Sequence, residues 1–189
     1  MKEALRNSYK QKRKALTEAA LKKISGDIFW QLRDELGHLL TGKIHVFLPI
    51  QKQKEIDTWP IIHWLWERGA EVVVSKSKLN TPDLEHFRLV HDTLLELNPW
   101  GIPEPVNAVP VDQSILTAVL IPLLCFDRHG HRIGYGKGYY DRFLDTCPNN
   151  PLKIGLSHFE PIEGYIEALE SDILLDYCVT PSATYKFEA

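Results

Sequence analysis

Over the first 36 residues, apolar side chains recur at every third or fourth position, starting at Leu5 and ending at Leu36. This is the period of a helix with one buried face, so the pattern predicts an amphipathic helix. Gly26 is the point at which this helix is expected to break, and Gly37 is its expected end.

The remaining residues alternate short apolar runs with further helical patterns. The runs are rich in β-branched and aromatic residues, which predicts buried strands at residues 43–48, 70–74, 118–124, 153–157 and 177–180. Helices are expected at residues 57–69, 139–147 and 166–169. Residues 84–97 fit a strand with a turn or short helix, and the proline-rich residues 98–106 fit a loop. This alternation favours a single α/β domain over residues 1–189, with helices on both faces of a mostly parallel sheet.

The composition is typical of a cytoplasmic globular protein. The chain has 189 residues, 44% hydrophobic and 25% charged, which is enough for a full core without disulfides or structural metals. Its three cysteines are scattered and form no CxxC pair, which argues against zinc or redox chemistry. The longest apolar run, residues 118–125, is too short to span a bilayer, and the first residues lack a signal-peptide pattern. We therefore expect neither secretion nor membrane insertion.

Charge is distributed unevenly along the chain. The net charge is −3, yet residues 1–23 contain eight basic and only two acidic residues, so a cationic first segment precedes an acidic body. On a helix, Lys2, Arg6, Lys10 and Arg13 fall within about 80° of one another, beside the apolar face, where cations can point into a cleft. Such a segment suits a nucleic acid, a phosphorylated small molecule or simple solvation.

The segment from Phe126 to Leu144 carries the strongest chemical signal. Four glycines fall between residues 130 and 138, after the best strand and before a helix, together with Arg132 and Lys137. Glycine amides can approach an anion without interference from a Cβ atom, so the arrangement predicts a phosphate site, with a bare turn as the alternative. The spacing matches neither the dinucleotide-binding GxGxxG pattern nor the P-loop, because a glycine follows Lys137.

Asp141 is the candidate magnesium ligand of this segment. In the first turn of the expected helix, its carboxylate can cap the helix or hold Mg²⁺, which takes one or two carboxylates besides phosphate and water oxygens. A second carboxylate could come from Asp172, although Glu170 and Asp176 stand nearby and spacing alone does not choose among them.

Two residues elsewhere are candidates for contact with an organic ligand. Glu55 follows the strand that ends near Leu48, at the edge where open α/β sheets bind their ligands, and is otherwise a surface glutamate. Trp100 offers a stacking surface within the proline-rich loop, or else anchors that loop.

Five segments, taken in order, resemble the 5-formyltetrahydrofolate cyclo-ligase (methenyltetrahydrofolate synthetase) family. They are KEALR at 2–6, FLP…EIDT at 47–58, WGIPEP at 100–105, IPLLCFDRHGHRIGYGKGYYDRFL at 121–144 and the aspartate-bearing tail near 172–180. The FDxxGxRxGxGxGYYDR element within the fourth segment is the most specific. The resemblance implies a three-layer α/β sandwich similar to sugar-phosphate isomerases and CoA-transferases.

The resemblance also implies ATP- and Mg²⁺-dependent closure of 5-formyltetrahydrofolate to 5,10-methenyltetrahydrofolate, with release of ADP and phosphate. In the family mechanism, the formyl oxygen attacks the γ-phosphate, and the N10 nitrogen displaces phosphate from the resulting intermediate. The protein then has to align the reactants and neutralise developing charge. A reduced folate and ATP are the expected partners, without nucleic acid or membrane, and a monomer is the expected state.

Carried over onto this sequence, the family's functional residues fall into four groups. The catalytic cations are expected to be Arg132 and Lys137. The ATP contacts are expected at Lys2, Glu3, Ala4, Leu5, Arg6, Arg132, Ile133, Gly134, Tyr135, Gly136, Lys137, Gly138, Tyr139 and Tyr140. The folate contacts are expected at Leu48, Glu55, Trp100, Tyr135, Gly136, Lys137, Gly138 and Tyr139. The metal ligands are expected to be Asp141 and Asp172.

The chain departs from the family pattern in three places. Some members carry Arg where this chain has Tyr135, so one cation is either missing or replaced by Lys137. The loop at residues 51–58 is slightly longer than usual, which affects the geometry around Glu55. Near the tail, Pro161 and Ser171 stand where the family often has Gln and His, which bears on the role of Asp172.

Two other functions fit parts of the pattern. An isomerase of the same fold class, acting on a sugar phosphate, would use the glycines as an anion site without ATP. A small nucleic-acid-binding module would use the cationic first segment, although the acidic body would repel a polyanion. The full set of segments favours the ligase.

Overall fold

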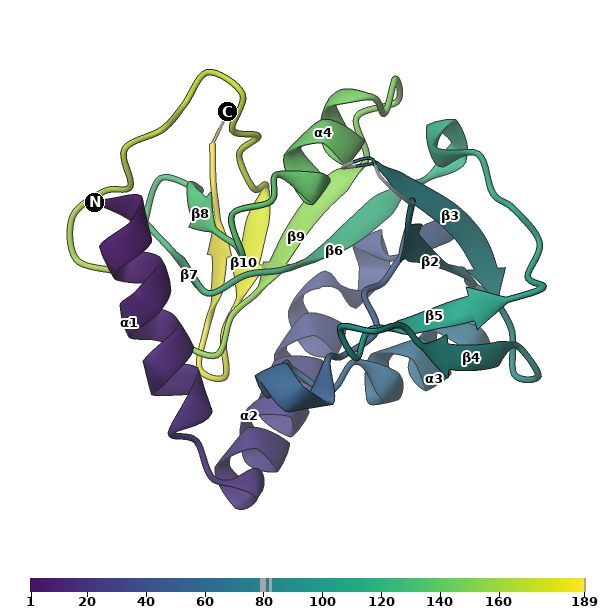
Figure 1. The fold of residues 1–189 in the computed structure, drawn as a ribbon, viewed down its shortest axis with the longest axis horizontal. Helices are drawn as coiled ribbons and strands as arrows, with labels where there is room; N and C mark the ends of the chain where they lie inside the picture. The colour runs from purple at the N-terminus through teal and green to yellow at the C-terminus, as the bar shows by residue number, and fades with distance from the viewer. Residues whose placement is uncertain (79–80, 82, 189) are drawn as a thin grey trace.

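A seven-stranded sheet forms the centre of the molecule, in the order β11-β10-β9-β6-β1-β2-β3 (Figure 1). The computed structural model describes residues 1–78, 81 and 83–188. The strands of this sheet are β1 Lys43–His45, β2 Glu71–Ser77, β3 Leu84–Leu89, β6 Ala118–Pro122, β9 Leu152–Leu156, β10 Tyr177–Val179 and β11 Thr184–Lys186. The five inner strands are parallel, and β3 and β11 join antiparallel at the edges. The expected α/β fold with a mostly parallel sheet is confirmed.

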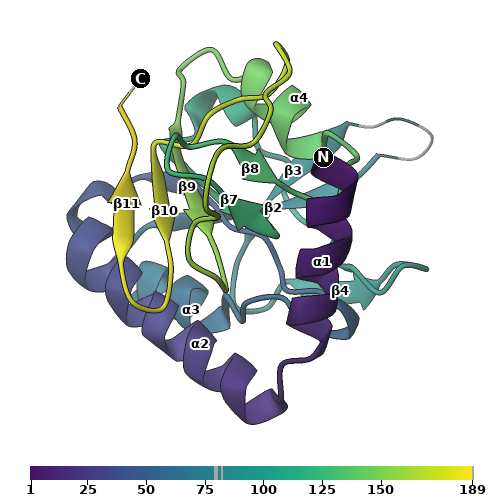
Figure 2. The same cartoon turned by 90° about the vertical axis from the view of Figure 1, so that its left-hand side faces the viewer.

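Helices cover both faces of this sheet. Helices α2 (Glu18–Gln31) and α3 (Trp59–Glu67) lie on one face and α4 (Tyr139–Asp145) on the other, while α1 (Lys2–Lys14) stands at the side (Figures 1 and 2). Successive strand residues point to opposite faces. In β2, Val72 and Val74 accordingly join the core under α2 and α3, whereas Val73 joins the core under α4. Burial on both sides explains why these strands are apolar throughout.

The first 36 residues fold differently from the single helix that their period predicts. The helix is interrupted between α1 and α2. There Thr17 has an extended backbone, and its hydroxyl oxygen accepts a hydrogen bond from the Ala20 N–H at 3.1 Å. This cap stabilises a new helix start, so the break falls there, and the predicted break at Gly26 is wrong because Gly26 lies inside α2. After α2 the helix widens into a π turn at Leu32–Leu36 and ends in a 3₁₀ turn at Gly37–Leu39.

Several smaller elements also differ from the sequence predictions. Residues 84–97 contain two strands and no helix, since β4 (Leu94–Leu97) follows β3 and pairs with β5 (Pro103–Val106) inside the expected loop. Residues 166–169 are not helical, and the Ile166 N–H donates a hydrogen bond to the Asp127 carboxylate at 2.7 Å. Strand β11 was not predicted. The other elements are the hairpin of β7 (Cys125–Phe126) and β8 (Arg132–Ile133) and the 3₁₀ turns Gln51–Gln53 and Gln113–Ile115.

Helix α1 packs on the β7–β8 hairpin rather than on the main sheet. Its Leu5 and Tyr9 contact a small cluster formed by Cys125, Ile133 and Ile166. The hairpin leads directly into the glycine loop, residues 134–138, so this packing brings the cations of α1 to that loop. Within the described part of the chain, no helix is long and apolar enough to cross a membrane.

Candidate active site

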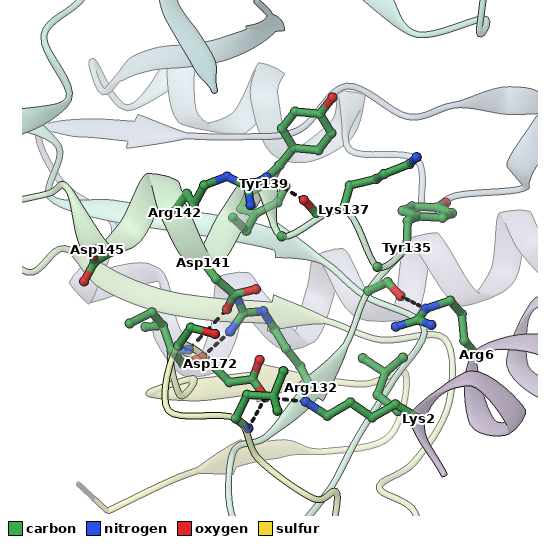
Figure 3. A pocket seen from close by; sticks show the side chains of 18 of the residues that line it. Lys2, Arg6, Arg132, Tyr135, Lys137, Tyr139, Asp141, Arg142, Asp145 and Asp172 are labelled. Carbon is green, nitrogen blue, oxygen red and sulfur yellow. Dashed lines mark hydrogen bonds and ion pairs between the residues drawn. The ribbon is translucent and has the colours of Figure 1, made fainter. Parts of the chain in front are cut away.

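A cavity of about 420 Å³ lies between the start of α1, the glycine loop and residues 169–173. Figure 3 shows Lys2 and Arg6 reaching it from α1, and Asp141 from α4. Charged side chains of both signs line it: Lys2, Arg6, Arg132, Lys137, Arg142, Asp141, Asp145, Glu170 and Asp172. We call it the charged cavity.

The glycine loop is shaped to receive Arg6. The Arg6 Nε donates a hydrogen bond to the Gly134 carbonyl oxygen at 3.1 Å. Gly136 has a φ of +89°, and a Cβ atom there would lie 2.9 Å from the Arg6 Cζ, so a side chain would be strained and would displace the guanidinium. Gly138, with a φ of +67°, then begins α4. These two positions therefore require glycine for structural reasons as well as for access to an anion.

The two expected metal carboxylates both line the charged cavity, and each is held from one side only. Asp141 Oδ1 accepts hydrogen bonds from Arg132 Nη2 at 2.6 Å and from the Ile173 N–H at 3.1 Å. Asp172 Oδ2 accepts from Lys2 Nζ at 2.5 Å and from the Leu169 N–H at 2.9 Å. These bonds engage one oxygen of each carboxylate.

The N-cap residue of α4 is Gly138, which has no side chain to cap the helix. Asp141 keeps its place in the first turn of α4, where the helix dipole favours a carboxylate, and its side chain turns to Arg132. Partial burial disfavours charge on Asp172, but the hydrogen bond from Leu169 and the ammonium of Lys2 outweigh it and lower the pKa of Asp172. Asp172 is therefore ionised at neutral pH.

The neighbouring acids are less suited to a metal. Asp176 lies outside the charged cavity, where its Oδ2 accepts the Lys153 N–H at 2.7 Å and pairs with the Lys153 ammonium at 3.0 Å. Glu170 lines the cavity but is exposed. Among the residues described, no cluster of three or more histidines, cysteines and acids could enclose a metal ion, so a metal here would rely on carboxylates together with ligand oxygens.

A second cavity, of about 400 Å³, lies on the other side of the glycine loop. Most of its wall is apolar or uncharged, and among the residues that the structure describes Glu55 is the one carboxylate that lines it; we call it the apolar cavity. Leu48 forms part of this wall, and Trp100 reaches it from the β4–β5 hairpin while remaining 72% exposed. The expected folate contacts outside the glycine loop thus gather in one place.

The two cavities meet at the glycine loop. Both are lined by Pro122, Tyr135, Lys137, Tyr139 and Tyr140. A ligand in one cavity therefore shares this wall with a ligand in the other. The loop is placed so that two reacting molecules could meet across it.

Glu55 is buried, with only 5% of its surface exposed. Its Oε2 accepts a hydrogen bond from the Ile50 N–H at 2.7 Å, and its Oε1 accepts one from the Tyr135 hydroxyl at 2.6 Å. Burial raises the pKa of Glu55, and these hydrogen bonds oppose that rise. The carboxylate is therefore a fixed acceptor in an apolar wall, which suits a ligand with N–H donors.

Sequence reasoning missed a pair of histidines under the apolar cavity. His45 Nε2 lies 2.6 Å from the Ser75 hydroxyl oxygen, which lies 3.0 Å from His86 Nδ1. Burial lowers the pKa of His45 well below its usual range and that of His86 to about 4, so both are neutral at pH 7. No sequence signal marks them, since His45 sits in an apolar strand and the β2–β3 register alone brings Ser75 to His86.

The sequence model of the 5-formyltetrahydrofolate cyclo-ligase family matches residues 1–181. The chain belongs to this family. A probable 5-formyltetrahydrofolate cyclo-ligase of Caenorhabditis elegans is 30% identical over 200 residues, which cover 100% of this chain and 92% of the relative. The 5-formyltetrahydrofolate cyclo-ligase of Escherichia coli K12 is 27% identical over 184 residues, which cover 94% of this chain and 99% of the relative. The expected family and ATP-dependent ligase activity are thereby confirmed.

Two solved structures of 5,10-methenyltetrahydrofolate synthetases share the fold of this chain. The NMR structure of Aquifex aeolicus 5,10-methenyltetrahydrofolate synthetase superposes with a TM-score of 0.74 at 24% identity, covering 100% of this chain and 93% of its own. The Mycoplasma pneumoniae 5,10-methenyltetrahydrofolate synthetase gives a TM-score of 0.74 at 22% identity, covering 95% and 98%. At these identities the likeness supports the α/β fold.

The residues carried over from the cyclo-ligase family do not all reach the cavities. Of the α1 residues, Lys2 and Arg6 line the charged cavity, whereas Glu3 and Ala4 are exposed and Leu5 packs on the β7–β8 hairpin. The glycine-loop residues all line one or both cavities, as do the flanking Arg132, Ile133, Tyr139 and Tyr140. The roles of all these residues in binding and catalysis stay predictions.

Proposed function

We propose that the chain closes 5-formyltetrahydrofolate to 5,10-methenyltetrahydrofolate, with the triphosphate of ATP in the charged cavity and the folate in the apolar cavity. The observation that carries this assignment is the wall shared by the two cavities, which is formed by Tyr135 and Lys137 of the glycine loop together with Pro122, Tyr139 and Tyr140. An ATP-dependent cyclo-ligase needs two substrates in contact, and this is where two ligands would touch.

The charged cavity is suited to a triphosphate. Arg6 lies on the glycine loop, Lys2 and Arg132 stand opposite, and Lys137 reaches the shared wall (Figure 3). The cations Lys2 and Arg132 are now paired with Asp172 and Asp141. A polyanion with its counter-cation can exchange these partners, so that cations turn to phosphate oxygens and carboxylates turn to the metal.

Asp141 and Asp172 are the residues that would hold Mg²⁺. Each carboxylate makes its observed hydrogen bonds through one oxygen, which leaves the other for a metal ligand bond. Two carboxylates together with phosphate oxygens match what Mg²⁺ prefers in phosphoryl-transfer sites. Bound Mg²⁺ would offset the negative charge of the phosphate groups during transfer.

The apolar cavity is suited to the folate. Trp100 and the Leu48 side chain offer flat and apolar surface, and Glu55 offers carboxylate oxygens to the N–H donors of a pterin edge. Lys137 and Tyr139 lie in the wall shared with the charged cavity, beside the place where the formyl group would approach the γ-phosphate.

The reaction then follows from alignment and charge neutralisation. The formyl oxygen attacks the γ-phosphorus, the bond to the bridging oxygen breaks, and ADP leaves. The N10 nitrogen attacks the activated formyl carbon and loses its proton to water, the bond from that carbon to the phosphorylated oxygen breaks so that phosphate leaves, and the five-membered ring closes as the methenyl cation. Arg132 and Lys137 stabilise the charge that develops on the transferred group, and no covalent protein nucleophile is required.

An absorbance assay tests this function directly. Purified protein is mixed with 5-formyltetrahydrofolate, ATP and magnesium, and the methenyl product is followed by its ultraviolet absorbance while released phosphate is measured in parallel. We expect product and phosphate in equal amounts, and no product when ATP or magnesium is omitted. A flat absorbance trace with the complete mixture contradicts the proposal.

A further inference from the structure

Arg13 carries a buried charge that the proposed reaction does not use. It is 2% exposed, whereas its neighbours Lys12 and Lys14 on α1 are exposed. A buried guanidinium is costly unless it is hydrogen-bonded and compensated. Its Nη2 donates to the Tyr135 hydroxyl oxygen at 2.5 Å, and its Cζ lies 5.2 Å from the centre of the Tyr135 ring.

The direction of the hydrogen bonds beyond Arg13 is fixed by chemistry. A guanidinium only donates, so the Tyr135 oxygen accepts from Arg13. The single hydroxyl proton of Tyr135 must then go to Glu55 Oε1, which lies 2.6 Å away. Glu55 Oε2 already accepts from the Ile50 N–H, so both oxygens act as acceptors, as in the ionised carboxylate. Arg13, Tyr135 and Glu55 form a chain of donors that ends on a negative charge.

This series of hydrogen bonds from Arg13 through Tyr135 to Glu55 ends at the apolar cavity. Glu55 lines that cavity and Tyr135 lines both cavities, whereas Arg13 lines neither and stands behind Tyr135. Burial raises the pKa of Glu55, and the charge of Arg13 is among the influences that lower it. Titratable groups on other elements also interact with these residues. Burial and the charge of Glu55 raise the pKa of Tyr140 on α4, and burial and the charge of Arg13 lower the pKa of His158, after β9.

We propose that Arg13 is a positioning residue for the folate, which holds the Tyr135 hydroxyl on Glu55 and keeps Glu55 a charged acceptor for the pterin N–H groups. This inference rests on the proposed function, in which Glu55 binds the folate. It also answers the question raised by Tyr135, which stands where some family members carry Arg. The guanidinium comes here from α1 and acts through the tyrosine, rather than being replaced by Lys137.

The test compares Arg13→Gln with Lys14→Gln, which removes the same charge from an exposed position on the same helix. Because Arg13 acts through Tyr135 on Glu55, which lines the apolar cavity and not the charged one, we expect the KM for 5-formyltetrahydrofolate to rise about tenfold in Arg13→Gln, the loss typical of a charged hydrogen bond. The KM for ATP should stay within about twofold of wild type. Lys14→Gln should match wild type in both.

A double-mutant cycle shows whether Arg13 acts through Tyr135. Tyr135→Phe removes the hydroxyl and keeps the ring, so it should raise the folate KM by a similar factor. Arg13→Gln combined with Tyr135→Phe should be no worse than Tyr135→Phe alone. An unchanged folate KM in Arg13→Gln, an equal rise in the KM for ATP, or effects that simply multiply would each overturn the inference.

Two further measurements keep the outcome clear. Thermal unfolding shows whether each variant is folded. If Arg13→Gln does not fold, Arg13→Lys is tested in its place, because the shorter lysine side chain keeps the positive charge but does not reach the Tyr135 hydroxyl. An unchanged folate KM in folded Arg13→Lys would also overturn the inference. If wild type binds 5-formyltetrahydrofolate without cyclising it, the proposed function fails, and the same comparison is then made with the folate Kd from tryptophan fluorescence.

Discussion

The two cavities beside the glycine loop handle charge in opposite ways. In the charged cavity, cations and carboxylates pair directly, as in Lys2 with Asp172 and Arg132 with Asp141. In the apolar cavity, the Glu55 carboxylate is buried, and it accepts hydrogen bonds from a backbone N–H and a tyrosine hydroxyl. The charged cavity has ion pairs that can change partners, whereas the carboxylate of the apolar cavity is held in place by its hydrogen bonds.

This difference matches the two kinds of ligand. A triphosphate brings several charges and a metal, so a site made of exchangeable ion pairs can reorganise around it at modest cost. A pterin brings neutral N–H donors and an aromatic face, so its site needs an acceptor that is already in place. Substitutions in the charged cavity should therefore change ATP and magnesium dependence, and those near the apolar cavity should change folate affinity or stability.

The largest effect is expected for Lys137, which lines both cavities. Lys137→Met removes a cation from the wall where the phosphoryl group would meet the formyl oxygen, so kcat should fall by about 10²–10³. Lys137 is exposed, so the thermal unfolding temperature should hardly change. Steady-state kinetics and thermal unfolding measure both, with Lys22→Met, an exposed lysine on α2, as the control. A kcat near wild type would place the phosphoryl transfer away from this wall.

Asp141→Asn should have the next largest effect. The amide keeps the size of the carboxylate but binds Mg²⁺ poorly, so we expect kcat to fall by about 10² and the magnesium concentration for half-maximal rate to rise. Asp172→Asn should raise the same magnesium requirement. Magnesium titrations at saturating ATP give both values. If activity and thermal stability fall together without a change in magnesium dependence, Asp141 serves only to hold Arg132.

Arg6→Ala should affect ATP binding and spare folate binding, which is the reverse of what we expect for Arg13→Gln. Arg6 lies on the glycine loop and faces the charged cavity, so its loss should raise the KM for ATP about tenfold and leave the KM for folate nearly unchanged. Lys14→Ala on the same helix is the control. If the ATP dependence is unaffected, the first helix contributes no phosphate contact and its cations are merely solvated.

The sheet and the glycine loop were predictable because their signals are local. Apolar runs mark β6 and β9 directly, and the glycines with Arg132 and Lys137 form one continuous segment. The elements that were missed depend on partners far along the chain. Strand β5 contains Pro103 and Pro105 and exists because β4 pairs with it, and β11 is held by its pairing with β10.

The parts of the candidate site that come from one continuous segment could be predicted from the sequence. The contacts that arise when distant segments pack together could not. The period of α1 placed Arg13 in the same cationic group as Lys2 and Arg6, but it could not show that Arg13 is buried against Tyr135. The contact joins residues 122 positions apart in the sequence. The same holds for His45 and Ser75, which become neighbours only when β1 and β2 pair.

The last prediction concerns the stability of the fold rather than catalysis. Burial lowers the pKa of His86, beneath the apolar cavity, from 6.5 to about 4. Above pH 6.5 the side chain is neutral in both the folded and unfolded states, and between pH 6.5 and about 4 only the unfolded chain takes up the proton. The free energy of unfolding should therefore fall over this interval, by roughly 1–3 kcal/mol.

Substitution identifies the group responsible for this pH dependence. His86→Phe cannot take up a proton, so the slope of unfolding free energy against pH should become shallower, although the loss of the Ser75 contact lowers stability at pH 7. His63→Gln, an exposed histidine on α3, should leave the slope unchanged. Asp172 in the charged cavity has a lowered pKa and stays ionised over most of this interval, so this carboxylate contributes little to the slope. Equal slopes in wild type and His86→Phe, from chemical denaturation at several pH values, would show that His86 is accessible to protons in the folded state.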